Sequence, residues 1–180
     1  MSDHIQIIAD VEVSLEKAEA SAECIIKWMI DIHAIAPPPI ASEEHYAVYS
    51  PRDYEIVSET WAGYDLHGLC SNEFEIHIDR QVTHTFQSEF ELRCPNCQKD
   101  GSDGKWSDAI SEWHDERGIG MLKCVHCGNA QPVTEWTFDP EWGFGFLSFQ
   151  FWNWPPLKKS FIKEFTERLG HKTVYIADKF

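Results

Sequence analysis

Residues 4–32 read HIQIIADVEVSLEKAEASAECIIKWMIDI, and the spacing of their apolar side chains changes at Ser14. Before Ser14 the apolar residues alternate with polar ones, and only Ile8 breaks the period of two, which predicts a half-buried strand. After Ser14 they recur every three or four positions, which predicts an amphipathic helix that ends before Pro37. The chain is therefore predicted to begin with a strand followed directly by a helix.

Further strands and a second long helix are predicted along the chain. Residues 74–78 alternate cleanly and residues 86–92 form a second alternating run, so we expect the two runs to lie side by side with an acidic outer face. Residues 142–154 carry aromatic side chains at both parities, which indicates a central strand covered on both faces. A helix over residues 157–169 and a short strand over residues 173–176 complete the pattern.

Two Cys-x-x-Cys pairs, Cys94 with Cys97 and Cys124 with Cys127, lie between these predicted elements. Four thiolates in two such pairs are the donor set of a closed tetrahedral zinc site, which leaves no open position for a catalytic water. We therefore expect one structural Zn²⁺ ion. The alternatives are four unligated thiols or a redox-active pair.

The two pairs resemble the knuckles of zinc ribbons over residues 92–134 and nowhere else in the chain. In that family each pair lies at the tip of a β-hairpin, so the resemblance implies that backbone N–H groups point at the sulfur atoms. Gln98 departs from the family pattern, because a glycine usually stands there, and the 26 residues between the knuckles form a long loop. A small helix with Trp106, Ile110 and Trp113 on one face accounts for the extra length.

Together these elements predict an α+β protein. The order βαβ, insert, βαβ is similar to a ferredoxin-like fold, a two-layer α/β sandwich, here with an inserted zinc ribbon. An unrelated α+β arrangement is the alternative. We expect residues 1–92 and 135–180 to form one α+β domain and residues 93–134 to form the inserted zinc-ribbon subdomain.

The formal charge of −15 is unevenly distributed along the chain. Residues 1–92 hold 18 acidic and 4 basic side chains, a net charge of −14, whereas residues 143–180 hold 3 acidic and 6 basic ones. A strongly acidic surface repels phosphates and anionic membranes and attracts basic proteins, although it also simply keeps a protein in solution. No secretory signal and no apolar run of membrane-spanning length is evident, so we expect a cytoplasmic protein.

These observations favour a non-enzymatic, acidic zinc-binding protein that acts through protein–protein interaction with a basic partner. Immunity and inhibitor proteins have this composition, but the analogy is at the level of the class and no motif supports it. The candidate partner-binding residues are the helix face of Trp106, Ile110 and Trp113 and the acidic strand residues Glu73, Glu75 and Asp79.

Two other functions stay open. Many zinc ribbons bind nucleic acid, and the C-terminal segment supplies Lys158, Lys159, Lys163 and Lys172, but the ribbon segment itself lacks a basic stripe, which makes this function the less favoured one. A hydrolase would need an acid–base pair, and the candidates are His77 or His84 beside Glu73, Glu75 and Asp79, and the cluster of His114, Asp115 and Glu116. Each of these clusters is equally typical of a solvated surface, so no catalytic residue is assigned.

Overall fold

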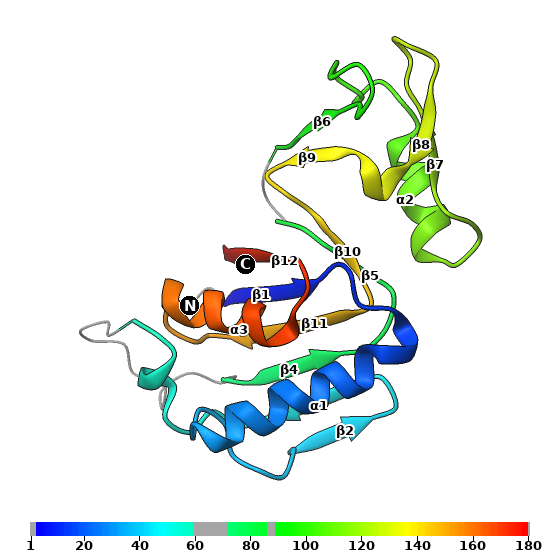
Figure 1. Cartoon of the computed structure of the whole chain (residues 1–180). Helices are drawn as coiled ribbons and strands as arrows, with labels where there is room; N and C mark the ends of the chain where they lie inside the picture. Colours follow the sequence, from blue (N-terminus) through cyan, green and yellow to red (C-terminus); the bar gives the residue numbers. More distant parts are fainter. Residues whose placement is uncertain (1–2, 60–71, 86–88, 180) are drawn as a thin grey trace.

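The computed structural model describes residues 3–59, 72–85 and 89–179, and its main feature is a six-stranded antiparallel sheet with two helices on one face (Figure 1). The helices are α1 (Leu15–Asp31) and α3 (Lys159–Leu169). The strands of the sheet are β1 (His4–Asp10), β2 (Ala41–Glu43), β3 (Tyr46–Tyr49), β4 (Phe74–His77), β11 (Leu147–Trp152) and β12 (Thr173–Lys179).

The strand order of the sheet is β12–β1–β11–β4–β3–β2, and each neighbouring pair is antiparallel. It follows that β1 and β4, joined through α1, run parallel with β11 between them. In the same way β11 and β12, joined through α3, run parallel with β1 between them. These two interleaved βαβ units are the ferredoxin-like arrangement predicted from the sequence. The β2–β3 hairpin extends the sheet beyond β4.

Residues between β4 and β11 form a second region, drawn in green and yellow above the sheet in Figure 1. In its described residues, 78–85 and 89–146, it contains one α-helix, six short strands in three two-stranded sheets, and a single helical turn at Val133–Glu135. These elements are β5 (Gln81–Thr83), β6 (Glu91–Arg93), α2 (Trp106–His114), β7 (Met121–Lys123), β8 (Ala130–Pro132), β9 (Thr137–Asp139) and β10 (Gly143–Gly145).

The first strand and helix lie close to their predicted positions, and the turn between them is held by side-chain hydrogen bonds from β1. Ser14 occupies the N-cap position of α1 and makes no side-chain capping bond. The carboxylate of the buried Asp10 instead accepts the backbone N–H groups of Glu12 and Val13, at 3.0 and 2.9 Å. Leu15, predicted to belong to the apolar face of the helix, is 46% exposed. The turn is therefore stabilised by the end of β1 and not by the helix cap.

The prediction that residues 86–92 lie beside residues 74–78 was wrong. Within this run the structure describes only residues 89–92, and β6 pairs with β9, where Leu92 lies opposite Phe138. Both edges of β4 are already occupied by β3 and β11. An alternating pattern shows which face of a strand is buried, but it does not show which strand lies beside it.

The aromatic run 142–154 supplies a central strand of the core, as its pattern indicated, and its Trp142 and Trp152 are partly exposed. It contains β10 and β11, and β11 lies in the middle of the sheet, where Phe149 and Phe151 are fully buried. Phe149 packs edge-to-face on Phe165 of α3, with ring centres 4.8 Å apart. Such aromatic contacts join the sheet to its helices.

A buried glutamine fixes the approach to α3. Gln6 is 3% exposed, and its amide nitrogen donates to the carbonyl oxygens of Trp154 and Pro155 at 3.0 and 3.1 Å. Its amide oxygen accepts the Leu157 N–H at 2.7 Å and the Tyr175 hydroxyl at 2.8 Å. Every hydrogen-bonding capacity of the side chain is used, so the buried amide carries no desolvation penalty.

Two antiparallel strands connect the sheet to the second region. His77 pairs with Ser148 in the sheet, and after a bend the same two stretches pair again as β5 and β10, with Gln81 opposite Gly145. A Cβ atom on Gly145 would lie 2.1 Å from the carbonyl oxygen of Asp10, so only glycine allows β10 to cross the end of β1 this closely. The insertion therefore leaves and re-enters the sheet at neighbouring positions.

The second region has an apolar cluster of its own. Its buried members are Leu92, Cys94, Ala109, Trp113, Leu122, Cys124, Val133, Trp136, Phe138 and Phe144. The cluster extends to Phe144 in β10, beyond the predicted limits of 93 and 134, and the partly buried Val82 of β5 packs against it. The exact division into two domains stays a prediction.

Candidate metal centre

The first cysteine pair lies in a tight turn after β6. The Cys94 N–H donates to the carbonyl oxygen of Lys99 at 3.0 Å, and the Gln98 N–H donates to the carbonyl oxygen of Cys94 at 2.9 Å. Gln98 adopts a left-handed backbone conformation, with φ of 59°. A glycine adopts this conformation without strain, which is why its absence from the sequence was notable.

The second pair repeats this geometry after β7. The Cys124 N–H donates to the carbonyl oxygen of Asn129 at 2.8 Å, and the Gly128 N–H donates to that of Cys124 at 3.0 Å. Gly128 has a φ of 76°, matching Gln98 in the first turn. Both cysteine pairs therefore lie in knuckle turns of the same form.

The two knuckles are copies of one ten-residue pattern that we did not identify from the sequence. Residues 91–100 read ELRCPNCQKD and residues 121–130 read MLKCVHCGNA. Both contain leucine, a basic residue and Cys-x-x-Cys in the same order. The leucines, Leu92 and Leu122, are buried in the same apolar cluster as Cys94 and Cys124. The repeat was detectable in principle, but it has only four common positions.

The four sulfur atoms converge on one point. They all lie within 4.8 Å of one another. The Cys94 and Cys127 sulfurs are 3.9 Å apart and those of Cys97 and Cys124 are 3.7 Å apart, so each close pair joins the two knuckles. Sulfurs on a tetrahedron with metal–sulfur bonds of about 2.3 Å are about 3.8 Å apart, whereas a disulfide requires about 2.0 Å. The cluster can therefore hold a metal ion, and among the described residues it is the one group of this kind.

The thiols differ in their affinity for protons. The backbone N–H of Asn129, with help from the Asn96 amide 3.5 Å from the sulfur, lowers the pKa of Cys127 to about 6. The backbone N–H of Lys99 acts in the same direction on Cys97, but burial and the neighbouring thiols outweigh it and raise the pKa to about 11. Without a cation, a thiolate at one sulfur makes it harder for the neighbouring thiols to lose their protons. A metal ion removes this effect, which couples its binding to proton release.

The centre is built into the second apolar cluster. Cys94 and Cys124 are each 1% exposed, whereas Cys127 is exposed. The two buried sulfurs belong to the same cluster as Trp113 of α2. Two ligands of any ion held here, Cys94 and Cys124, would therefore lie in the buried apolar cluster, whereas Cys127 would face solvent.

The predicted partner-binding face of α2 lies largely against the chain itself. Trp113 is 8% exposed and packs edge-to-face on Phe144, with ring centres 5.3 Å apart. The guanidinium of Arg80 lies 5.0 Å from its ring centre and donates to its carbonyl oxygen at 2.8 Å. Trp106 and Ile110 are partly buried against the same cluster. The docking role stays a prediction, and only Trp106 and Ile110 retain accessible surface for it.

The three acidic strand residues predicted to bind a partner differ in their exposure to solvent. Glu75 forms a 3.2 Å contact with His77 and is 12% exposed, whereas Asp79 is exposed and Glu73 is half-buried. Burial raises the pKa of Glu75, but hydrogen bonds from His77, Tyr46 and Trp152 outweigh it and leave the pKa below its ordinary value. Burial and the same carboxylate raise the pKa of Tyr46.

The remaining histidines considered for catalysis are not brought together with His77. His84 stacks on Trp142, with ring centres 4.4 Å apart, and His114 contacts the exposed Asp115 at 3.1 Å. His77 and Glu75 do form a close pair, and Tyr46 joins them from β3. Tyr46 was not predicted as a site residue, because the segment around it has no clear period.

The chain was compared with models of protein families, with curated proteins and with solved structures, and none of the three comparisons found a match. In the part of the chain that the structure describes, no helix is both long enough and apolar enough to cross a membrane. Inferences about function therefore rest on the chemistry of these residues.

Proposed function

We propose that this protein binds one Zn²⁺ ion through Cys94, Cys97, Cys124 and Cys127, and that the ion is structural. The observation that carries the proposal is the spacing of the sulfurs, 3.7 and 3.9 Å across the two knuckles. A set of four thiolates in tetrahedral spacing suits Zn²⁺, and it leaves no open coordination position for chemistry. Free thiols of this kind persist in a reducing compartment, which supports a cytoplasmic location.

Metal analysis of the purified chain tests this proposal. Native mass spectrometry should give one zinc ion per chain, and acid should release it as the thiolates take up protons. Protein freshly purified under reducing conditions that carries no metal, or that carries iron, would contradict it.

We further propose that the protein acts by binding a basic protein. The support is the net charge of −14 on residues 1–92, which favours fast association with a positively charged surface. Immobilised protein should capture basic proteins at low salt and release them at moderate salt. Recovery of no partner, or only of partners that resist salt, would count against this proposal.

Nucleic-acid binding is a weaker candidate, because carboxylates beside two of the four lysines it needs reduce their attraction for phosphates. Lys158 donates to the carbonyl oxygens of Glu55 and Ile56 at 2.7 and 3.2 Å. Lys163 and Lys172 form ion pairs with Glu167 and Glu141. A gel-shift experiment with mixed oligonucleotides at low salt should show no complex.

A further inference from the structure

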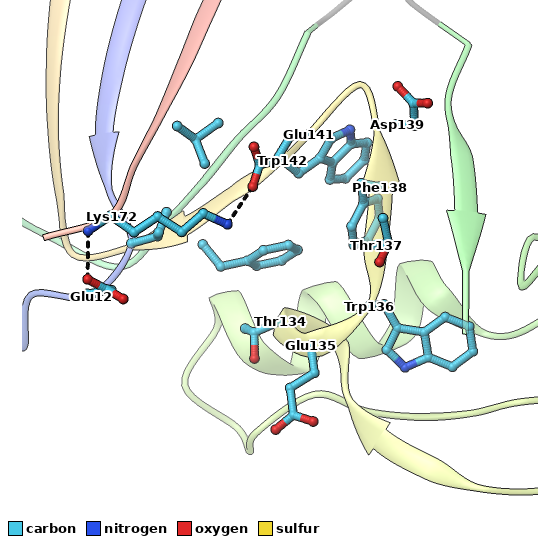
Figure 2. Close-up of a pocket in the computed structure, with 13 residues that line it drawn as sticks. Glu12, Thr134, Glu135, Trp136, Thr137, Phe138, Asp139, Glu141, Trp142 and Lys172 are labelled. Carbon is cyan, nitrogen blue, oxygen red and sulfur yellow. Dashed lines mark hydrogen bonds and ion pairs between the residues drawn. The ribbon is translucent and has the colours of Figure 1, made fainter. Parts of the chain in front are cut away.

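A cleft of about 670 Å³ lies between the end of the sheet and the second region (Figure 2). Glu12, Lys172 and Val174 line it from the sheet, and residues 134–139 and 141–142 line it from the other side. This volume is within the range of pockets that hold a small ligand or a large side chain. The cleft shares no residue with the cysteine centre.

The walls of the cleft combine carboxylates with aromatic rings. Its acidic residues are Glu12, Glu135, Asp139 and Glu141, and Lys172 is the one basic residue among those that line it. Phe138 and Trp142 line the cleft as a stacked pair, with ring centres 4.5 Å apart, and the buried Phe144 adds an apolar surface. Because Phe138 is buried and Trp142 also stacks on His84, the attraction for a cation comes from the carboxylates, and the aromatic rings supply an apolar wall.

The chain already places a cation of its own across this cleft. Figure 2 shows Lys172 between Glu12 and Glu141. Its ammonium group is 2.6 Å from a carboxylate oxygen of Glu141, and its backbone N–H donates to Glu12, also at 2.6 Å. The cleft thus accommodates a positively charged side chain in the folded protein.

This internal cation is held weakly. The side chains of Lys172 and Glu141 are 59% and 56% exposed, so water and salt screen their attraction. Exposed pairs of this kind contribute about 0.2–1 kcal/mol. A cation whose donors reach a second carboxylate of the cleft as well as Glu141 would gain interactions that the lysine ammonium does not make.

We propose that this cleft receives an arginine side chain from a basic protein partner, in exchange for Lys172. The inference rests on the proposed binding of a basic protein, because it says where that partner is held. A planar guanidinium can pair with one carboxylate through two parallel hydrogen bonds, and its five N–H donors can reach a second carboxylate at the same time. It is also more weakly hydrated than an ammonium group, so entry into a partly aromatic cleft costs it less.

The test uses the full metal-loaded chain and a hexapeptide of alternating arginine and glycine, with lysine and citrulline versions for comparison. Binding is followed by NMR through the indole N–H signals, assigned by single tryptophan substitutions. The arginine peptide should shift the Trp142 signal, the lysine peptide should bind several-fold more weakly, and the neutral citrulline peptide should not bind. Equal binding of the arginine and lysine peptides would overturn the choice of arginine.

Two pairs of variants separate the cleft from the overall charge. Lys172→Met removes the internal competitor and should tighten peptide binding about two- to fivefold, the range of an exposed ion pair. Glu141→Gln should weaken binding by a similar factor. The matched controls are Lys163→Met and Glu167→Gln, which alter an exposed lysine–glutamate pair on α3 and change the net charge equally.

The α3 controls should change peptide binding by less than the cleft variants do. Equal effects of the two sets, or no shift at Trp142, would overturn this inference and leave the proposed binding of a basic protein standing. That broader proposal fails separately, if no salt-sensitive basic partner is captured at all.

Discussion

The six-stranded sheet with α1 and α3, here called the sandwich, and the second region of this protein are stabilised in different ways. In the sandwich, β1 and β12 are seven residues long, and the sheet and two helices bury a continuous apolar core. Each strand of the second region has three residues and pairs with one other strand. Two-stranded sheets are marginally stable in water. The comparison predicts that packing alone suffices for the sandwich, whereas the second region also needs a metal ion held by its four cysteines.

Loss of the metal centre should produce the largest difference between the two regions. With Cys94→Ser we expect no bound metal and unfolding of the second region, because structural zinc contributes on the order of 10 kcal/mol in small zinc domains. Hydrogen exchange should show lost protection in α2, β7 and β8 and retained protection in β1, β11 and β12. Cys24→Ser, at an exposed position of α1, is the matched control and should change neither. Equal loss of protection in both regions would refute the comparison.

A core truncation in the sandwich should destabilise the sandwich and leave the metal centre of the second region intact. Phe149→Ala removes a fully buried ring and should lower the free energy of unfolding of the sandwich by about 3–5 kcal/mol, with metal content unchanged. The counterpart is Phe138→Ala, in the cluster beside the cysteines. It should accelerate metal loss to a chelator and leave the sandwich transition in place. Denaturant titration and chelator kinetics measure the two effects, and faster metal loss with Phe149→Ala would count against separate stabilisation.

The smallest expected effect tests whether the two knuckle turns are structurally equivalent. Gln98 holds a left-handed conformation that costs a non-glycine residue about 1 kcal/mol, so Gln98→Gly should stabilise the second region by up to this amount. Gly128→Ala should destabilise it by a similar amount, although its Cβ would meet no atom within 4 Å. Opposite shifts in the chelator concentration needed to remove the metal would confirm that the knuckles are equivalent. Shifts of the same sign would show that they are not.

The sequence predicted features that depend on residue identity or on local period. The change of spacing at Ser14 located β1 and α1, and the two Cys-x-x-Cys pairs located the cluster, because both signals lie within short stretches. The order of β12, β1, β11 and β4 agrees with the ferredoxin-like arrangement that the sequence favoured over other α+β arrangements, since two βαβ units have few ways to share one sheet.

Features that depend on distant parts of the chain were not predicted. The partner of β6 is β9, about 45 positions later, and alternation in residues 86–92 contains no information about it. Tyr46 meets Glu75 because β3 lies beside β4. The cleft brings Glu12 and Glu141 to Lys172 from three separate segments. In each case the tertiary fold determines the contact, and no local pattern records it.

The adjacent exit and return of the insertion have a consequence for chain entropy. Because His77 pairs with Ser148, the sheet closes a loop that contains the entire second region. The entropy cost of closing a loop rises only with the logarithm of its length, by about 0.6 kcal/mol for each doubling. An unfolded insertion therefore costs the sheet only a few kcal/mol more than a tight turn in its place would. A chain in which a tight turn joins β4 directly to β11 is expected to form a minimal sandwich of six strands and two helices.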